Sequence, residues 1–369
     1  MRALVPTDPA QLKRNNFNAI RLAMALAVVW SHSFALGIGT EDSEPISQLL
    51  GNVYNAGNLA VLTFFAVSGF LITDSYIRSE NWKIYLRNRV ARIYPGYLVA
   101  VAVCSFIVVP LFSTGFYWNS AHVLPMLSNV FLKGYIPTSD AFGGGAVNGS
   151  LWSISYEFWC YIGILGLGIT GLLKRRMIFP VIAFVVIVVR IWLDLTGRRP
   201  AGVLQPLIGM AYFWFNVLPP FLLGAAFLLY RDSIPRSRWL LAALILCTIA
   251  ASHLPIDDLH RTVITRTLMP LTLAYTTLYV AFSSIRLPNV TLYGDFSYGT
   301  YLYAFPIQQM LRVEMDTRAS LPMYAILSAI LSVLAGVASW WLVERWFLAL
   351  AKRSRRTAPL TTEEALVAP

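Results

Sequence analysis

The sequence is poor in charge and in cysteine. Asp, Glu, Lys and Arg make up 13% of its 369 residues, and only three residues are cysteine. Because about a quarter of the residues of a soluble domain are charged, this composition excludes an ordinary soluble protein, and three cysteines are too few for a disulfide-stapled scaffold. Cys104, Cys160 and Cys247 lie inside apolar runs, so we expect them to pack and not to form a bridge or a metal site.

Motifs for nucleotides and metals are also missing. The chain contains no P-loop, no dinucleotide fingerprint, no His-Glu-x-x-His and no Cys-x-x-Cys. We therefore expect no metal and no nucleotide hydrolysis.

Apolar residues dominate what is present. Hydrophobic side chains make up 57% of the chain, and the mean hydropathy is +0.61. A bilayer-spanning helix needs about 20 mostly apolar residues, so we predict an all-α polytopic transmembrane helix bundle of about ten spans. The predicted spans are residues 16–37, 57–77, 95–113, 151–173, 177–195, 211–230, 238–254, 265–284, 294–312 and 322–349.

The net charge of +11 comes from an uneven distribution of basic residues. With ten spans both termini share a side, and nineteen of the 29 Lys and Arg residues fall on that side against six on the other. Cytoplasmic loops carry an excess of Lys and Arg, so we predict that both termini are cytoplasmic. The basic excess then serves topology and contact with anionic membrane lipids, and it gives no support to a nucleic-acid partner.

One membrane domain is predicted to account for most of the chain. We expect a cytoplasmic segment at residues 1–15, a transmembrane domain at 16–350 and a cytoplasmic tail at 351–369. No small-residue cleavage site follows the first apolar run, so we expect that run to stay as the first helix. Residues 122–135 are too short to cross a bilayer alone, and we expect a partial, re-entrant or interfacial helix there.

Ionisable residues at membrane depth are costly and mark candidate sites. His32 lies about 8 Å below the predicted outer end of the first span, and Glu157 about 9 Å below the same surface on the fourth, at 1.5 Å per residue. An imidazole and a carboxylate at one depth can form a general base and its orienting partner, although both could equally be packing residues with satisfied hydrogen bonds. Arg190 is near the same level, where we favour snorkelling to the interface.

A basic segment follows the second predicted span. Residues 81–95 alternate basic and apolar side chains at helical spacing, as in an interfacial helix that ends at Pro95. Arg89 and Arg92 are three residues apart and share a face, which suits two guanidinium groups that grip phosphate oxygens. Contact with anionic lipid explains this segment equally well. Near the ninth span, we expect Asp295 to cap a helix.

Six sequence elements follow one another along the chain. They are Arg21 with His32, and residues 64–72, 89–95, 151–157, 296–303 and 343–345. In this order they resemble the acyltransferase-3 family of membrane acyltransferases, and the resemblance covers about residues 15–350. The chain departs from the family pattern at Ala304, where a histidine is common, and it resembles the stand-alone form without an appended esterase-like domain.

This resemblance implies transfer of an acyl group, most often acetyl from acetyl-CoA, to a hydroxyl of a cell-surface or lipid-linked saccharide at the bacterial inner membrane. It implies that Arg21, Arg89 and Arg92 bind the acyl-CoA donor. His32 would act as general base on the acceptor hydroxyl, or would itself be transiently acylated, and Glu157 would fix its tautomer. A homo-oligomer or an assembly with polysaccharide biosynthesis proteins is compatible with this interpretation.

A second function class fits the same residues. A proton-coupled transporter or flippase for a lipid-linked sugar would also place His, Glu and Arg inside a ten-helix bundle. The sequence has no evident inverted repeat or paired broken helices, which disfavours a transporter. A structural or sensory bundle without chemistry would leave the buried charges unexplained.

Overall fold

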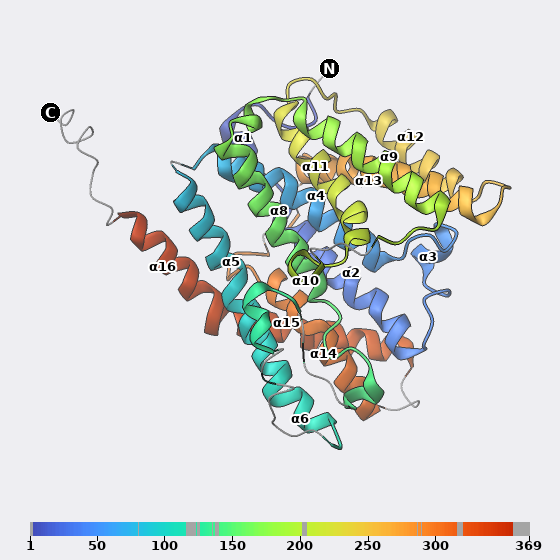
Figure 1. Cartoon of the computed structure of the whole chain (residues 1–369), viewed down its shortest axis with the longest axis vertical. Helices are drawn as coiled ribbons and strands as arrows, with labels where there is room; N and C mark the ends of the chain where they lie inside the picture. The colour runs from blue at the N-terminus through green and yellow to red at the C-terminus, as the bar shows by residue number, and fades with distance from the viewer. Residues whose placement is uncertain are drawn as a thin grey trace.

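The computed structural model is a bundle of helices (Figure 1). It describes residues 3–79, 81–115, 123, 126–134, 136, 140–200, 205–285, 287–288, 290–315 and 320–356. These residues contain no β-strand, and the single isolated bridge among them joins Ala3 to Pro235. The predicted all-α class is confirmed.

Within the described residues, ten long helical stretches and several shorter helices make up the bundle. The long stretches are α2 (Phe17–Gly37), α4 (Ala56–Ile77), α5 (Trp82–Val103) with η1 (Cys104–Val108) and α6 (Val109–Phe112), α8 (Trp152–Ile169), α9 (Ile178–Thr196), α11 (Ala211–Leu229), α12 (Arg238–Ala251), α13 (Asp258–Ala281), α14 (Ser297–Met315), and α15 (Leu321–Ser339) with η6 (Trp340–Glu344) and α16 (Arg345–Arg356). The shorter ones are α1 (Pro9–Lys13), α3 (Pro45–Leu49), η2 (Ser128–Phe131), η3 (Ala141–Gly144), η4 (Leu172–Lys174) and α10 (Gln205–Ile208).

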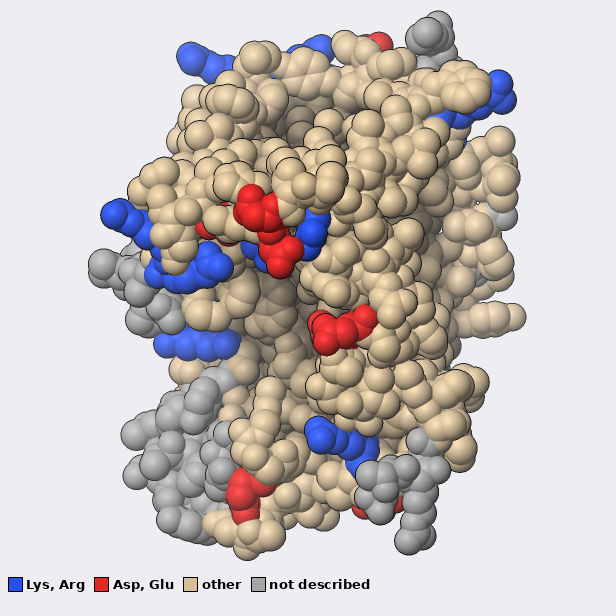
Figure 2. Space-filling model, turned by 90° about the vertical axis from the view of Figure 1, so that its right-hand side faces the viewer, with Lys and Arg blue, Asp and Glu red and all other residues tan. Residues whose placement is uncertain are grey.

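Six of the described helices are long and apolar enough to cross a membrane. They run over Ala10–Gly37, Ala56–Ile77, Trp82–Phe112, Ile178–Thr196, Ala211–Leu229 and Leu321–Lys352. Three other stretches, α8, α13 and α14, have at least 18 residues but a more polar composition, and α12 has only 14 residues. The chain is therefore a multi-pass helical membrane protein by length and composition. Figure 2 agrees, because most of the face that it shows carries no charged side chain.

The basic segment before the third span differs from its prediction. No separate interfacial helix ends at Pro95; α5 passes through this proline and continues to Phe112. Proline removes a single backbone donor, and neighbouring helices can satisfy the carbonyl that it frees. Arg89 and Arg92 consequently belong to a helix packed into the bundle. In the 122–135 segment the described part holds η2, and the rest lies outside the described residues.

Helix α4 lies at the centre of the bundle and is apolar on every side. It packs against α2, α8, α11 and α13, and more than half of its residues are buried. Two glycines let α4 and α11 touch through their backbones. A Cβ atom on Gly69 would lie 1.9 Å from the Phe221 carbonyl oxygen, and one on Gly224 would lie 2.1 Å from the Ala66 carbonyl oxygen. Small residues at this crossing therefore set the helix separation.

The Gly69→Ala variant should be markedly destabilised, because the added methyl collides with backbone and not with a mobile side chain. We expect a cost of about 1–3 kcal/mol or more, the range for overpacking a core. The matched control is Gly163→Ala on α8, where an added Cβ meets nothing within 4 Å. Helix propensity should make that variant neutral or more stable by up to about 1 kcal/mol. Thermal unfolding of the detergent-solubilised proteins measures both, and equal melting temperatures would contradict the tight crossing.

Candidate active site

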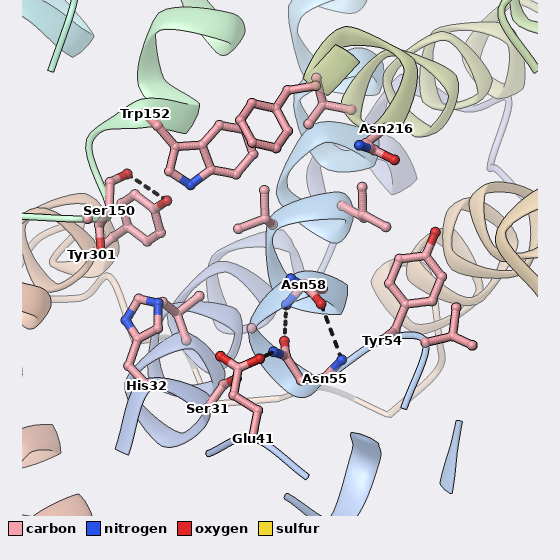
Figure 3. A pocket seen from close by; sticks show the side chains of 18 of the residues that line it. Ser31, His32, Glu41, Tyr54, Asn55, Asn58, Ser150, Trp152, Asn216 and Tyr301 are labelled. Atoms are coloured by element: carbon pink, nitrogen blue, oxygen red, sulfur yellow. Dashed lines mark hydrogen bonds between the residues drawn. The ribbon is translucent and has the colours of Figure 1, made fainter. Parts of the chain in front are cut away.

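His32 lies in the wall of a cavity of about 220 Å³ where α2 ends and α4 and α8 begin (Figure 3). The ring of Phe305 meets the imidazole edge-on at 5.1 Å between centroids. The buried Nδ1 atom of His32 has no hydrogen-bond partner among the described residues. A buried polar atom without a partner is costly, so this nitrogen lacks a hydrogen-bond partner that a bound ligand could supply.

Helix capping brings the amide groups of this cavity together. The Asn55 side chain accepts a hydrogen bond from the Asn58 backbone, and the Asn58 side chain accepts one from the Asn55 backbone, which forms a reciprocal cap at the start of α4. The Asn55 amide also donates to the Glu41 carboxylate at 2.5 Å. The hydrogen bonds that cap α4 thus hold Asn55, Asn58 and Glu41 in place beside Ser31 and His32, as Figure 3 shows.

Two hydrogen-bond donors of the cavity wall are unused by the protein. Among the described residues, neither the Trp152 indole nitrogen nor the Asn216 amide forms a hydrogen bond, and both residues line the cavity. The hydroxyl groups of Tyr301 and Ser153 lie 2.6 Å apart, and Tyr301 also donates to the Ser150 carbonyl at 2.9 Å. Aromatic rings with free amide and indole donors suit a polar ligand that has both flat faces and hydroxyl groups.

Glu157 lies deeper in the bundle than His32. Its carboxylate accepts hydrogen bonds from Ser68 and from Tyr161, the latter at 2.6 Å, and makes none to His32. On α4, Gly57 contacts Ser31 at the level of His32, whereas Ser68 marks the level of Glu157. Eleven residues of helix separate these two α4 positions, or about 16 Å at 1.5 Å per residue. The predicted equal depth and direct pairing of His32 and Glu157 are therefore wrong.

The segment before α8 explains this difference in depth. Val147, Asn148, Ser150 and Leu151 are buried, so the chain has already entered the protein when α8 starts. Trp152, the first residue of α8, lines the same cavity as His32. A hydropathy pattern cannot tell a buried loop from the top of a helix, because both are apolar.

Arg21 and Arg92 meet at one carboxylate at the other end of α2. Asp295 forms ion pairs with Arg21, at 2.7 Å, and with Arg92. Burial disfavours the charged form of Asp295, and the two guanidinium groups offset that cost. Asp295 also accepts from the backbone and hydroxyl of Ser297. These contacts place Asp295 beside the start of α14, where we expected a cap, and the ion pairs to Asp295 were not predicted.

Arg89 differs from its neighbour Arg92. Its guanidinium lies 5.9 Å from the centre of the Tyr161 ring, and its buried Nε atom has no hydrogen-bond partner. No carboxylate among the described residues forms an ion pair with it. Of these two arginines, Arg92 is therefore paired with an acidic side chain and Arg89 is not.

A smaller cavity of about 50 Å³ lies beside the cavity of His32. Arg21, Glu157, Ser297 and Tyr298 line it, and it shares Val61 and Tyr301 with the cavity of His32. Arg92 joins Arg21 at Asp295, and Arg89 contacts Tyr161, the partner of Glu157, although neither arginine lines either of these cavities. We call the path from these arginines past the two cavities to His32 the route. Arg21, Arg89, Arg92 and Glu157 lie at one end, and His32 lies at the other.

Arg190 does not snorkel to the interface as we predicted. It is 3% exposed, and its Nε lies 3.7 Å from Asp194 on the next turn of α9. Its Nη2 donates to the hydroxyl of Tyr54, which lines the cavity of His32. The signal in the sequence was the i, i+4 spacing of Arg190 and Asp194, which places opposite charges side by side on a helix.

Comparison with known proteins gives one family. Residues 14–342 match the family described as an acyltransferase domain. An O-acetyl transferase of Shigella phage Sf6 is 29% identical over 354 residues, which are 91% of this chain and 96% of the phage protein. Acyltransferase MdmB of Streptomyces mycarofaciens is 26% identical over 161 residues, which are 42% of this chain and 39% of that protein. Nodulation protein 10 of Rhizobium leguminosarum bv. viciae is 38% identical over 93 residues, 24% of each chain. No solved structure matches the chain.

The family match covers every residue of the route from Arg21 to His32. It decides between the two function classes in favour of an enzyme. The chain belongs to the acyltransferase-3 family, and the protein is a multi-pass membrane acyltransferase.

Proposed function

We propose that this acyltransferase moves an acetyl group from cytoplasmic acetyl-CoA to a hydroxyl of a cell-surface or lipid-linked saccharide. The observation that carries the proposal is the His32 imidazole, whose buried Nδ1 has no partner in a cavity with free amide and indole donors. A saccharide fits such a wall, because its faces pack on Trp152 and Phe213 while its hydroxyls bind Asn58 and Asn216. The phage relative is named as an O-acetyl transferase, which agrees with a hydroxyl acceptor.

In the proposed reaction, His32 acts as general base. The imidazole takes the proton of the acceptor hydroxyl while its oxygen attacks the thioester carbonyl carbon. The carbon–sulfur bond breaks, the acetyl group stays on the acceptor oxygen, and the CoA sulfur leaves with the proton that His32 returns. A base that is free to bind the hydroxyl suits this step, and His32 has such a nitrogen.

The donor would enter from the end of the route where the arginines lie. Arg89 offers guanidinium groups to the donor phosphates, and Arg21 and Arg92 lie beside it around Asp295. The acyl arm would then pass the small cavity between Val61 and Tyr301 to reach His32. Eleven residues of α2, or about 16 Å, separate Arg21 from His32, and an extended pantetheine arm covers that distance.

We assign Glu157 to the donor side of this route. Its carboxylate holds the Tyr161 hydroxyl, and the Arg89 guanidinium lies over the Tyr161 ring. Glu157 would thereby position Arg89 for the phosphates and act on the reaction through that residue.

We further propose ten membrane spans with both termini in the cytoplasm of a bacterial cell, in its inner membrane. The excess of Lys and Arg on one side supports this orientation. Helices α8, α13 and α14 are long enough to cross, and polar residues inside a bundle are shielded from lipid by their neighbours. In this orientation the cytoplasmic end of the route holds the arginines, and the cavity of His32 faces outward. Contact with other copies or with polysaccharide biosynthesis proteins belongs to the same proposal.

The His32→Ala variant should lose acetyl transfer by a factor of about 10²–10⁴, the usual contribution of a general base. The measurement is transfer of labelled acetyl from acetyl-CoA to surface glycans by the purified, membrane-inserted protein. His260→Ala is the matched control, because His260 is exposed at the start of α13 and far from the cavity. Retained activity in His32→Ala would remove the base assignment.

The Arg89→Gln variant should weaken binding of CoA and raise the KM for acetyl-CoA about tenfold or more, because a charge-assisted phosphate contact is lost. The fold of this variant should persist, since Arg89 forms no ion pair with a carboxylate among the described residues.

Arg92→Gln should instead lower the melting temperature, because it removes one of the two arginine partners of Asp295. Calorimetric titration with CoA and thermal unfolding separate the two effects, and unchanged CoA affinity in Arg89→Gln would return this residue to lipid contact.

The Glu157→Gln variant tests which end of the route this carboxylate serves. We expect a raised KM for acetyl-CoA with little change in kcat, because Tyr161 and Arg89 lose their charged neighbour. The Ser68→Ala variant is the control, since it removes one hydrogen bond from the same carboxylate and keeps the charge. A fall in kcat with the KM unchanged would support the tautomer-fixing role instead.

A further inference from the structure

A single carboxylate near the cavity of His32 forms ion pairs with three arginines. Asp194 lies 3.7 Å from Arg190, 3.7 Å from Arg199 and 3.5 Å from Arg266. Its side chain is 4% exposed. The Tyr212 hydroxyl donates to the same carboxylate at 2.8 Å. The three guanidinium groups belong to α9, to the segment after it and to α13, so the fold brings them together from separate parts of the chain.

The charges of this cluster do not balance. Three guanidinium groups face one carboxylate, and no other acidic residue described by the structure forms an ion pair with any of the three. All three distances exceed that of a normal hydrogen bond between charged groups, about 2.7–2.9 Å. The Nε of Arg190 is buried without a hydrogen-bond partner. Arg190 is 4% exposed, whereas Arg266 and Arg199 are 28% and 58% exposed. The excess positive charge is therefore least screened at Arg190, and an anion beside the cluster would be attracted to it.

The cluster reaches the cavity of His32 at two places. Arg266 lines the cavity itself, and Arg190 donates to Tyr54, which also lines it. In Figure 3, Tyr54 lies on the side of the cavity away from His32. The acidic residue of the cavity, Glu41, lies on the His32 side and is bound to Asn55. We call Arg266, together with Tyr54 and the Arg190 guanidinium bound to it, the basic wall of the cavity.

We propose that this basic wall binds a carboxylate or phosphate group of the acceptor saccharide. This inference rests on the proposed function, because it names the chemical class of the acceptor in that reaction. The oxyanion would bind Arg266 directly, and Arg190 and Arg199 would supply the excess positive charge behind it. The acceptor is thereby held at two points, its anionic group at Arg266 and its reacting hydroxyl at His32.

The donor phosphates are poor candidates for this wall. The arginines that we assign to the donor surround Asp295 at the other end of α2, and the two cavities meet only at Val61 and Tyr301. A donor whose phosphates bound Arg266 would leave the Nε of Arg89 without the ligand that we assign to it. An anion at Arg266 must therefore come from the side of the acceptor or from a lipid headgroup.

The test measures binding to the full chain in nanodiscs of zwitterionic lipid at constant ionic strength. The probes are glucuronic acid, glucose 1-phosphate, glucose and glycerol 1-phosphate, and the readouts are ligand-dependent thermal stabilisation and acetyl transfer from acetyl-CoA. We expect at least one anionic sugar to bind about tenfold or more tightly than glucose, the gain of one charge-assisted contact. Stabilisation by glycerol 1-phosphate alone would mean a lipid headgroup site and would overturn the acceptor assignment.

Arg266→Gln should reduce the preference for the anionic sugar to about one, and Arg266→Lys should restore part of it, because lysine keeps the charge but loses the fork. Arg261→Gln is the matched control. Arg261 lies on the same helix with a similar exposed fraction, 27% against 28%, and pairs with Asp258 away from the cavity. An Arg266→Gln protein that still prefers the anionic sugar would overturn the inference.

The two proposals fail in different ways. If saccharide acetylation is intact but neither wild type nor variant prefers an anionic sugar, the basic wall is not an acceptor site and the proposed function stands. If anionic sugars bind through Arg266 but wild type transfers no acetyl group to any saccharide, the anion site stands and the proposed function falls.

Discussion

The cost of an unpaired polar group in a membrane bundle governs where this chain places its few charged residues. Asp295 pairs with Arg21 and Arg92, Glu157 accepts hydrogen bonds from Ser68 and Tyr161, and Asn55, Asn58 and Asn81 cap helices. Some buried polar atoms have no partner, and three of them lie near the site. The Nδ1 of His32, the Nε of Arg89 and the Nε of Arg190 are buried without partners, and each borders a place where the proposed reaction needs a ligand.

A single helix aligns the two ends of the site. Arg21 and His32 are eleven residues apart on α2, and eleven steps of about 100° return to nearly the same face after three turns. Both residues therefore face the same column of space, which α4, α8 and α14 complete through Val61, Glu157 and Tyr301. A long α-helix with one polar residue near each end is a simple way to join a donor site on one side of a membrane to an acceptor site on the other.

The sequence could predict the helices but not their relative depth. Apolar runs with at most isolated charges located the stretches that became α2, α4, α9 and α11 to within a few residues, because the composition and length of a span are local properties. The depth of Glu157 depends on a buried loop, and its apolar composition is indistinguishable from that of a helix. The pairing of Asp295 with Arg21 joins residues 274 positions apart, which no local pattern records. Arg190 and Asp194 could have been paired from their spacing.

The close crossing of α4 and α11 limits how the site can move. Backbone touches backbone at Gly69 and Gly224, so these two helices shift as one body or not at all. Val61 belongs to α4 and forms one side of the narrow passage between the two cavities. The opposite side is the ring of Tyr301, held by hydroxyl contacts to Ser150 and Ser153. In the proposed reaction, an acyl chain would pass between a helix that this crossing holds in place and a tyrosine ring that two hydrogen bonds hold, so the passage would widen only if those bonds break.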